Sequence, residues 1–199
     1  ALLDVCYITG PVIFEMYDDG GPFTETLGPL GWISGSGPGA GITFRPAAGE
    51  TVQITSNISY GIHLYEPASN RDPGYFTFEN LSLSNFTYTG IYVIDGDFIT
   101  IRNCVIACSN NGYPGIMFQG SGVDYCQSPL IVNTMITGNS SAAILMTNTP
   151  GADVIFNSIY QTRGTGIFMD SPNASDVPAR VANNAVYCSN NSYGLPVVI

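Results

Sequence analysis

The sequence predicts an all-β solenoid, because short apolar motifs recur along it and no helical periodicity accompanies them. An apolar strand that ends in asparagine recurs at intervals of 23, 30, 24 and 26 residues, ending at Asn80, Asn103, Asn133, Asn157 and Asn183. A period of roughly 20–50 residues is typical of solenoids. The segments are short, rich in β-branched and aromatic residues, and alternate with period two. The expected fold is a parallel β-helix of about six to seven coils, stacked about 4.8 Å apart.

A second series of strands lies between the first and supports the same period. Its members begin with glycine or alanine followed by isoleucine or leucine, at Gly61, Gly90, Gly115, Ala143, Gly166 and Gly194. In addition, the segment 103–113 aligns without a gap with the segment 183–193, an offset of 80 residues. At the observed spacing, this offset corresponds to three coils.

The first quarter of the chain differs from the rest in composition. Residues 1–50 hold ten of the 23 glycines and no asparagine. Because only the composition changes, we expect one domain over residues 1–199, with glycine-rich first coils at 1–50 and regular coils at 51–199.

The strand ending in asparagine and the Gly-Ile strand together carry a family resemblance. Segments such as Ile99-Thr-Ile-Arg-Asn103 followed by Gly115-Ile-Met-Phe resemble the right-handed β-helix repeat of the pectate-lyase-like superfamily, over residues 50–199. The resemblance implies a right-handed coil, and it leaves the activity open because the fold hosts many functions. We expect a non-catalytic member of the surface or sheath type.

The recurring asparagines predict a ladder along one corner of the coil. Asparagine tolerates the left-handed backbone geometry of a tight corner. Stacked amides donate hydrogen bonds from one coil to the next and satisfy buried polar groups. The predicted ladder comprises Asn80, Asn103, Asn133, Asn157 and Asn183.

The resemblance directs the search for chemistry to basic residues, as in lyases, and to clustered aspartates, as in hydrolases. The chain has no lysine, and His63 is its single histidine. Asp95 and Asp170 are expected at similar strand ends three coils apart, about 14 Å, which exceeds the roughly 5–9 Å of a glycosidase pair. Asp97, two residues after Asp95, is the remaining carboxylate candidate, and no basic cluster accompanies Arg102. We therefore expect no enzyme, no catalytic residue, no metal site and no cofactor, with calcium at acidic turns as the alternative.

The outward positions of the Gly-Ile strands form an apolar stripe. Its predicted members are His63, Tyr92, Met117, Leu145, Phe168 and Pro196. Exposed apolar patches most often mark protein contacts. A sugar platform and a face covered by a loop are the alternatives.

The charge balance excludes two classes of partner. Fifteen carboxylates against five arginines give a net charge of −10, whereas nucleic acids and anionic membranes require basic surfaces. No apolar run approaches the length of about 18 residues that membrane insertion requires.

The cysteines and sequons favour a secreted or cell-surface protein. An odd number of cysteines indicates a free thiol or an intermolecular bridge, and the five are Cys6, Cys104, Cys108, Cys126 and Cys188. Cys126 is expected to form a disulfide bridge with Cys104 or Cys108 one coil away, and Cys6 and Cys188 are expected to bridge successive subunits. Asn-x-Ser/Thr sequons predict glycosylation at Asn57, Asn85, Asn139, Asn173 and Asn190.

The ends of the coil carry the functional prediction. A solenoid requires polar caps, and none is evident in the sequence. The chain is therefore either a fragment or a subunit that assembles head to tail through the edges at Leu2, Val5, Tyr7, Leu195, Val197 and Ile199. We expect an extracellular structural protein that forms a surface layer, sheath or filament from copies of itself. The alternatives are a carbohydrate-active enzyme and a glycan-binding adhesin module.

Overall fold

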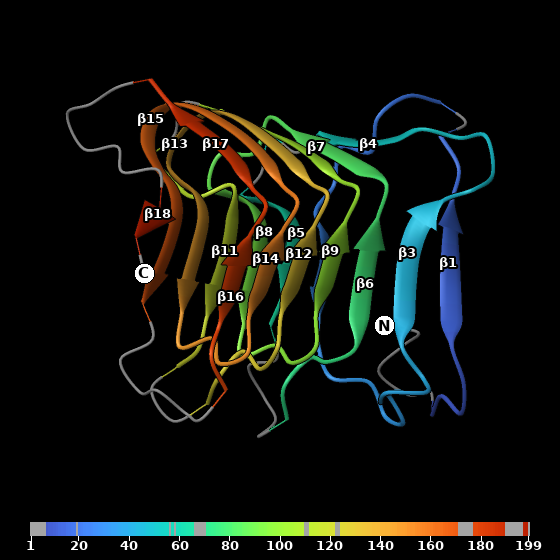
Figure 1. Cartoon of the computed structure of the whole chain (residues 1–199). Coiled ribbons are helices and arrows are strands. Elements are labelled where there is room, and N and C mark those ends of the chain that lie inside the picture. The colour runs from blue at the N-terminus through green and yellow to red at the C-terminus, as the bar shows by residue number, and fades with distance from the viewer. Residues whose placement is uncertain are drawn as a thin grey trace.

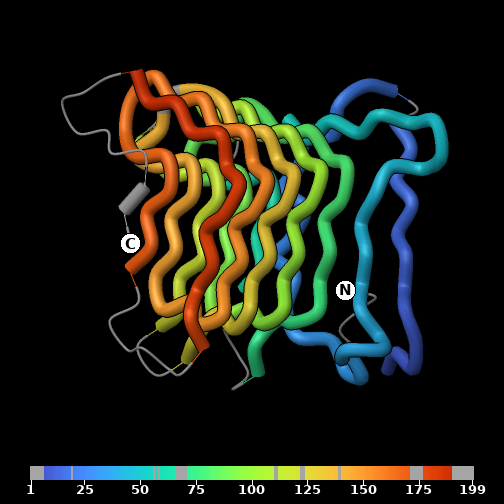
Figure 2. The backbone as a smooth tube through the Cα atoms, viewed as in Figure 1, coloured from blue at the N-terminus to red at the C-terminus, as the bar shows by residue number. Residues whose placement is uncertain are grey.

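A computed structural model describes residues 7–18, 20–55, 57, 59–65, 71–109, 112–121, 124–170, 177–189 and 197–198. Every regular element in these ranges is a β-strand, and the chain winds coil upon coil along one axis (Figure 2). Within the same ranges, no helix has the length and hydropathy of a membrane span.

One face of the coil is a seven-stranded parallel sheet, which runs from right to left across the front of Figure 1. Its strands, in spatial order, are β1 (Val12–Met16), β3 (Ile42–Pro46), β6 (Phe76–Glu79), β9 (Thr100–Arg102), β12 (Leu130–Val132), β14 (Asp153–Ile155) and β16 (Arg180–Ala182).

The other two faces belong to one eleven-stranded sheet. The second face contains β4 (Val52–Thr55), β7 (Leu81–Ser84), β10 (Val105–Cys108) and β17 (Ala185–Cys188). The third contains β2 (Leu27–Leu30), β5 (Tyr60–Leu64), β8 (Thr89–Ile94), β11 (Ile116–Gln119) and β18 (Val197–Val198). The long strands β13 (Met135–Thr147) and β15 (Ser158–Asp170) run through both faces.

Glycine allows the long strands to bend where the second face meets the third. Gly138 in β13 and Gly164 in β15 have φ of 125° and 84°, conformations that other residues rarely adopt. A Cβ at Gly138 would also clash with the carbonyl oxygen of Cys108 in the preceding coil. The sequence pattern of short strands therefore missed these two continuous strands.

The register confirms the three-coil offset between the two matching segments. Val105 pairs with Met135, Met135 with Ser158, and Ser158 with Ala185. Parallel in-register pairing carries each inward residue onto an inward residue of the next coil.

The core is continuous along the axis because inward positions are apolar in coil after coil. The rings of Phe14, Phe44 and Phe78 stack with centroid separations of 4.8 and 5.7 Å. Ile101 and Ile131 continue the same row and are fully buried. Burying side chains of this size contributes about 1.5–3 kcal/mol each, so the stack itself holds the coils together.

The corner after the seven-stranded sheet corrects one member of the predicted ladder. Asn80, Asn103, Asn133 and Asn183 are exposed and have φ between 48° and 57°, and Asn133 donates a 2.8 Å hydrogen bond to Asn103. Asn157 does not lie in this row. Strand β14 pairs so that its following residue, Phe156, occupies the left-handed position with φ 57°.

Asn157 belongs instead to a buried row one residue further along. Its neighbours there are Thr134 and Asn184, to which it is joined by hydrogen bonds. The predicted step from Asn133 to Asn157 was therefore one residue too long, because the asparagine of this coil follows the left-handed position instead of occupying it.

The predicted bridge between Cys126 and Cys104 or Cys108 is wrong, because all three are buried free thiols. Cys126 precedes β12 whereas Cys104 follows β9, so they lie at opposite ends of the seven-stranded sheet's strands. Burial raises the pKa of each thiol, to about 11 for Cys104 and about 12 for Cys126. Cys188 is also a free, partly exposed thiol, and Cys6 lies outside the described residues.

The predicted glycosylation and assembly residues are described in part. Asn57 and Asn85 are exposed, while the side chain of Asn139 and the whole of Asn173 and Asn190 lie outside the described residues. Tyr7 is 72% exposed, and its backbone forms an isolated parallel β-bridge with Ser34. Val197 begins β18, and Leu2, Val5, Leu195 and Ile199 lie outside the described residues.

Candidate functional site

Six aromatic rings gather on the outer side of the third face, where β5 and β8 pair. We call Tyr60, His63, Tyr65, Tyr88, Tyr92 and Tyr113 the aromatic surface. In β5, Ile62 and Leu64 point inward and are buried, so the intervening His63 points outward. Because His63 pairs with Tyr92, their rings lie one coil apart.

The rings contact one another closely. The centroids of Tyr60 and His63 are 4.4 Å apart, and those of His63 and Tyr92 are 5.5 Å apart with an interplanar angle of 6°. The ring centroids of Tyr88 and Tyr113 are 3.7 Å apart. Tyr65 and Tyr113 form the rim and are 37% and 39% exposed, respectively. The surface therefore offers ring edges and faces to solvent over a partly buried centre.

Two polar groups in this centre are shielded from water. The hydroxyl of Tyr92 donates a 2.7 Å hydrogen bond to Oε1 of Gln119, and burial raises the pKa of Tyr92 to about 12. Nε2 of His63 is buried and has no hydrogen-bond partner among the described residues. Burial lowers the pKa of His63, so its ring is neutral at pH 7.

Further along the axis, the stripe of outward residues continues as predicted until its last member. Met117 pairs with Tyr92 and with Leu145, and Leu145 pairs with Phe168, all partly buried. Phe168 then pairs with Val198, two residues beyond the predicted Pro196. The expectation for Pro196, which itself lies outside the described residues, was therefore wrong in register.

Four carboxylates gather where the strands of the third face end. We call Asp72, Asp95, Asp97 and Asp124 the acidic turn. Burial, followed by the negative charges of Asp124, Asp97 and Asp95, raises the pKa of Asp72 to about 6. Burial also raises the pKa of Asp97.

Two of these carboxylates hold the loop of the next coil. Asp95 accepts hydrogen bonds from the backbone N and the hydroxyl of Ser121, at 2.6 and 2.7 Å. Asp97 accepts one from the backbone N of Gln127 at 2.8 Å. Their first role is thus to fix the turn that follows β11.

Asp170 lies three coils from Asp95, as the sequence predicted. Asp170 pairs with Thr147 and is in register with Ile94, one position before Asp95, so it does not belong to the acidic turn. Asp18 accepts a 2.9 Å hydrogen bond from the backbone N of Gly21, as a turn residue does. Within the described ranges, no group of three or more His, Cys, Asp or Glu side chains has the arrangement of a metal site.

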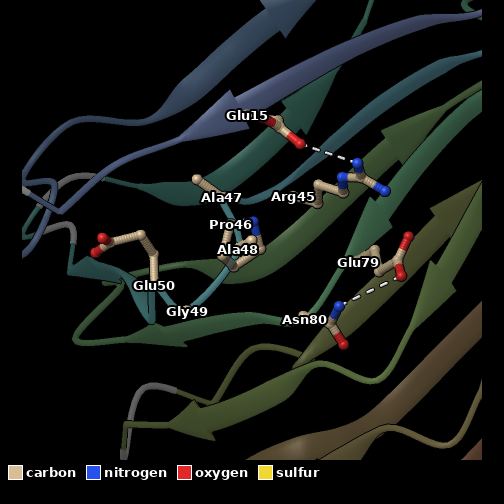
Figure 3. Close-up of a pocket in the computed structure, with 9 residues that line it drawn as sticks. All are labelled: Glu15, Arg45, Pro46, Ala47, Ala48, Gly49, Glu50, Glu79 and Asn80. Carbon is tan, nitrogen blue, oxygen red and sulfur yellow. Dashed lines mark hydrogen bonds and ion pairs between the residues drawn. The ribbon is translucent and has the colours of Figure 1, made fainter.

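A second cluster of charges, on the seven-stranded sheet, was not predicted. Arg45 contacts Glu15 at 2.9 Å and Arg102 contacts Glu79 at 2.6 Å, and the four lie in consecutive strands with alternating sign. Three of the four, Glu15, Arg45 and Glu79, border a hollow of about 430 Å³, which Asn80 and the corner 46–50 complete (Figure 3). The signal was present in the sequence, because each charge stands at the same distance after its inward phenylalanine or isoleucine. Arg102 by itself gives no sign of this cluster, because its partners stand in other coils, 23 or more residues away in the sequence.

These ion pairs neutralise most of the charged side chains that line the hollow. Exposed pairs of this kind contribute about 0–1 kcal/mol each. Their geometry favours holding neighbouring coils in register over binding a ligand.

The fold now described coincides with a known family. Residues 60–197, more than half of the chain, match the family model described as the right-handed β-helix region. The chain belongs to this right-handed β-helix family. No curated protein and no solved structure matches the chain.

Membership in the right-handed β-helix family accounts for the stacked coils and leaves the function to the outer faces. On this β-helix, the sequence pointed to His63, Tyr92, Asp95 and Asp97 singly. It did not bring in Tyr60, which is the first residue of β5. It also missed Tyr88, Tyr113 and Asp72, because these residues lie in corners of variable length, where alternation predicts nothing.

Proposed function

We propose that this right-handed β-helix binds a neutral saccharide at the aromatic surface. The observation that supports the proposal is the packing of six rings from three consecutive coils, with hydroxyl groups among them. Sugar rings present apolar C–H faces and a rim of hydroxyls, so they suit sites that combine aromatic rings with a few polar groups. We assign no reaction to this site, and we therefore propose that the protein binds the saccharide without cleaving it.

The neighbouring charges favour a neutral ligand over a uronate. Asp95 of the acidic turn lies three residues after Tyr92, and its negative charge adds to burial, Tyr60 and Tyr88 in raising the pKa of Tyr92. The whole chain carries a net charge of −10. Like charges brought together at an interface weaken binding, so an anionic polysaccharide is disfavoured.

The test compares ligands and variants by calorimetry and affinity electrophoresis. Neutral glucans, mannans and xylans should bind, whereas polygalacturonate should bind more weakly or not at all. The double variant Tyr65→Ala, Tyr113→Ala removes the exposed rim and should weaken binding about tenfold, as expected for losing about 1.4 kcal/mol of stacking.

Tyr17→Ala is the matched control, because Tyr17 is 54% exposed and lies outside the aromatic surface. Equal binding by both variants, or no binding of any neutral polymer, would contradict the proposal. Release of reducing ends during incubation would contradict the non-enzymatic part alone.

A second candidate function is head-to-tail assembly into an extracellular layer, sheath or filament. Two strands of the seven-stranded sheet favour it, because β1 and β16 each have a neighbour on one side only within the described part of the chain. The inward residues Phe14 and Val181 at these edges are partly buried, in contrast to fully buried Ile131 between them. Strand edges of this kind recruit further strands.

Electron microscopy and sedimentation of the purified chain test assembly. Filaments or rings support it, while dispersed particles under all conditions argue against it and favour coverage of the edges by other parts of a longer chain. Non-reducing electrophoresis examines the proposed Cys6–Cys188 bridge separately, since only a covalent ladder supports that link.

A further inference from the structure

The second face carries an apolar patch at its C-terminal coils that the proposed functions do not use. Its members are Val105, Met135, Tyr160 and Tyr187, which are 37%, 44%, 49% and 56% exposed. They point outward from the adjacent strands β10, β13, β15 and β17, because the alternate residues in these strands point into the core. We call these four residues the tyrosine patch.

The patch contains both a ridge and a hollow. The rings of Tyr160 and Tyr187 stack at 5.2 Å with an interplanar angle of 10° and form the ridge. Beside them lies a hollow of about 440 Å³, with Met135 at its border and the small residues Ser158 and Ala185 among its lining. The register explains this relief, since two tyrosines follow one another in one outward row while Ser158 and Ala185 follow one another in the next.

The hollow lacks charge although the chain is strongly acidic. Its lining contains no Asp, Glu, Arg, Lys or His, whereas the chain has a net charge of −10. Two copies of the chain repel each other over most of their surfaces, and least where no charge faces the partner. Protein interfaces are likewise depleted of charges at their centre and enriched in tyrosine and methionine.

We propose that the tyrosine patch docks a second copy of this chain in a two-fold symmetric dimer. A two-fold interface requires one patch to be complementary to itself. The tyrosine patch meets this requirement, because the ridge of one copy faces the hollow of the other when the two sheets pack face to face. Docking of this kind closes at two copies and leaves both the aromatic surface and the strand edges free.

The size of the patch sets the expected strength. Four strands about 4.8 Å apart and four residues of about 3.3 Å each give a flat footprint of about 250 Å². Stable interfaces bury about 800 Å² per partner. The footprint is about a third of that area, so the dimer is expected to be weak and to form only at high protein concentration.

Sedimentation velocity under reducing conditions tests the proposal between about 5 and 500 µM. The mass should rise from the 21.1 kDa of one chain toward twice that value. Tyr187→Asp places a charge on the ridge, and Ala185→Arg fills the hollow with a charged side chain. Each variant should remain a monomer at 500 µM with an unchanged circular dichroism spectrum, while Tyr17→Asp, a matched exposed tyrosine outside the patch, should dimerise as the parent does.

Two variants keep the test decisive if one of them fails to fold. A parent chain that stays monomeric at 500 µM overturns the proposal, as does a dimer that both folded variants retain. Species larger than a dimer also overturn it, because they indicate head-to-tail growth instead of a closed two-fold contact.

Discussion

Asn157 is joined to Asn184 in the next coil by two hydrogen bonds. The side-chain Nδ2 and the backbone N of Asn157 both donate to Oδ1 of Asn184, at 3.0 and 2.8 Å. Asn157 Nδ2 also donates to the carbonyl of Ile131 at 3.1 Å, and its Oδ1 accepts from the backbone N of Thr134 at 2.9 Å. The buried amide of Asn157 thus satisfies two backbone groups of the preceding coil and also binds the side chain of Asn184 in the next coil.

Asn157→Ala should destabilise the fold by about 2–4 kcal/mol. The variant leaves a backbone N–H at Thr134 and a carbonyl at Ile131 buried without these partners, and each such loss costs about 1–3 kcal/mol. Urea unfolding followed by tyrosine fluorescence measures the difference. Asn183→Gly, at an exposed left-handed position, is the control and should change stability by less than about 0.5 kcal/mol. Equal effects would contradict the distinction between the buried and exposed rows.

Gly138→Ala should be far more destabilising than Gly49→Ala. Both glycines have positive φ, 125° and 86°, so both variants carry backbone strain of about 1–2 kcal/mol. Only Gly138 also lacks space, since a Cβ there meets the carbonyl of Cys108 while none is near at Gly49. Thermal unfolding of the two variants separates strain from the clash. A Gly138→Ala chain as stable as Gly49→Ala would show that β13 does not pass so close to β10.

Phe156→Asn should stabilise the chain by about 0.5–1 kcal/mol. Phe156 adopts φ 57° between Asn133 and Asn183 in the exposed row and is 57% exposed, so little packing is lost on replacement. Asparagine tolerates this conformation better than phenylalanine. Phe156→Ala keeps the strain and should show no gain in urea unfolding. A gain in both variants would point to removal of exposed aromatic area as the cause.

His63 should make the fold less stable at acidic pH. Burial lowers its pKa in the folded chain below the ordinary 6.5, so the unfolded chain binds the proton more readily. Its contribution is complete above pH 6.5 and is lost as the pH falls below 6.5 toward the folded pKa. Urea unfolding between pH 7.5 and 5 should show this loss in the parent and not in His63→Gln. Parallel pH profiles would mean that the ring is freely solvated.

Asp72 should act in the opposite direction. Its pKa rises from 3.8 to about 6 on folding, through burial first and then through Asp124, Asp97 and Asp95. The folded chain therefore holds this proton more tightly, and stability is lost as the pH rises from about 3.8 to 6. Asp72→Asn should be more stable than the parent at pH 7 and equal to it at pH 3.5.

Salt and a second variant separate the causes at Asp72. Added salt should reduce the part of the gain that arises from neighbouring charges. Glu25→Gln removes one carboxylate near the start of β2, far from the acidic turn, and should produce no comparable gain. An equal gain in Glu25→Gln would assign the effect to net charge.

Much of the fold was predictable because stacking imposes a repeat that sequence displays directly. The Gly-Ile strands and the three-coil match were recognised since each inward Ile or Phe recurs at its own position in every coil. The apolar stripe was recognised for the same reason, from His63 to Phe168. The pairing of Phe168 with Val198 was not predicted, because these two residues are 30 positions apart whereas Gly166 and Gly194 are 28 apart.

The candidate site was predictable only where it lies on strands. Alternation placed His63 and Tyr92 on the outer side of the third face. Tyr60 begins β5, whereas Tyr65, Tyr88, Tyr113 and Asp72 lie in corners, where no period specifies direction. Their approach to the strand residues depends on how each loop closes.

Local pattern and composition thus determined the all-β repeat, the parallel stacking and the strongly acidic, lysine-free surface, because each depends on residues within one period. The tertiary structure decided which amide is buried, that Asn157 meets Asn184 and not Asn183, that the core cysteines remain thiols, and that six rings share one surface. These features depend on register between coils, and a shift of a single residue exchanges an exposed position for a buried one.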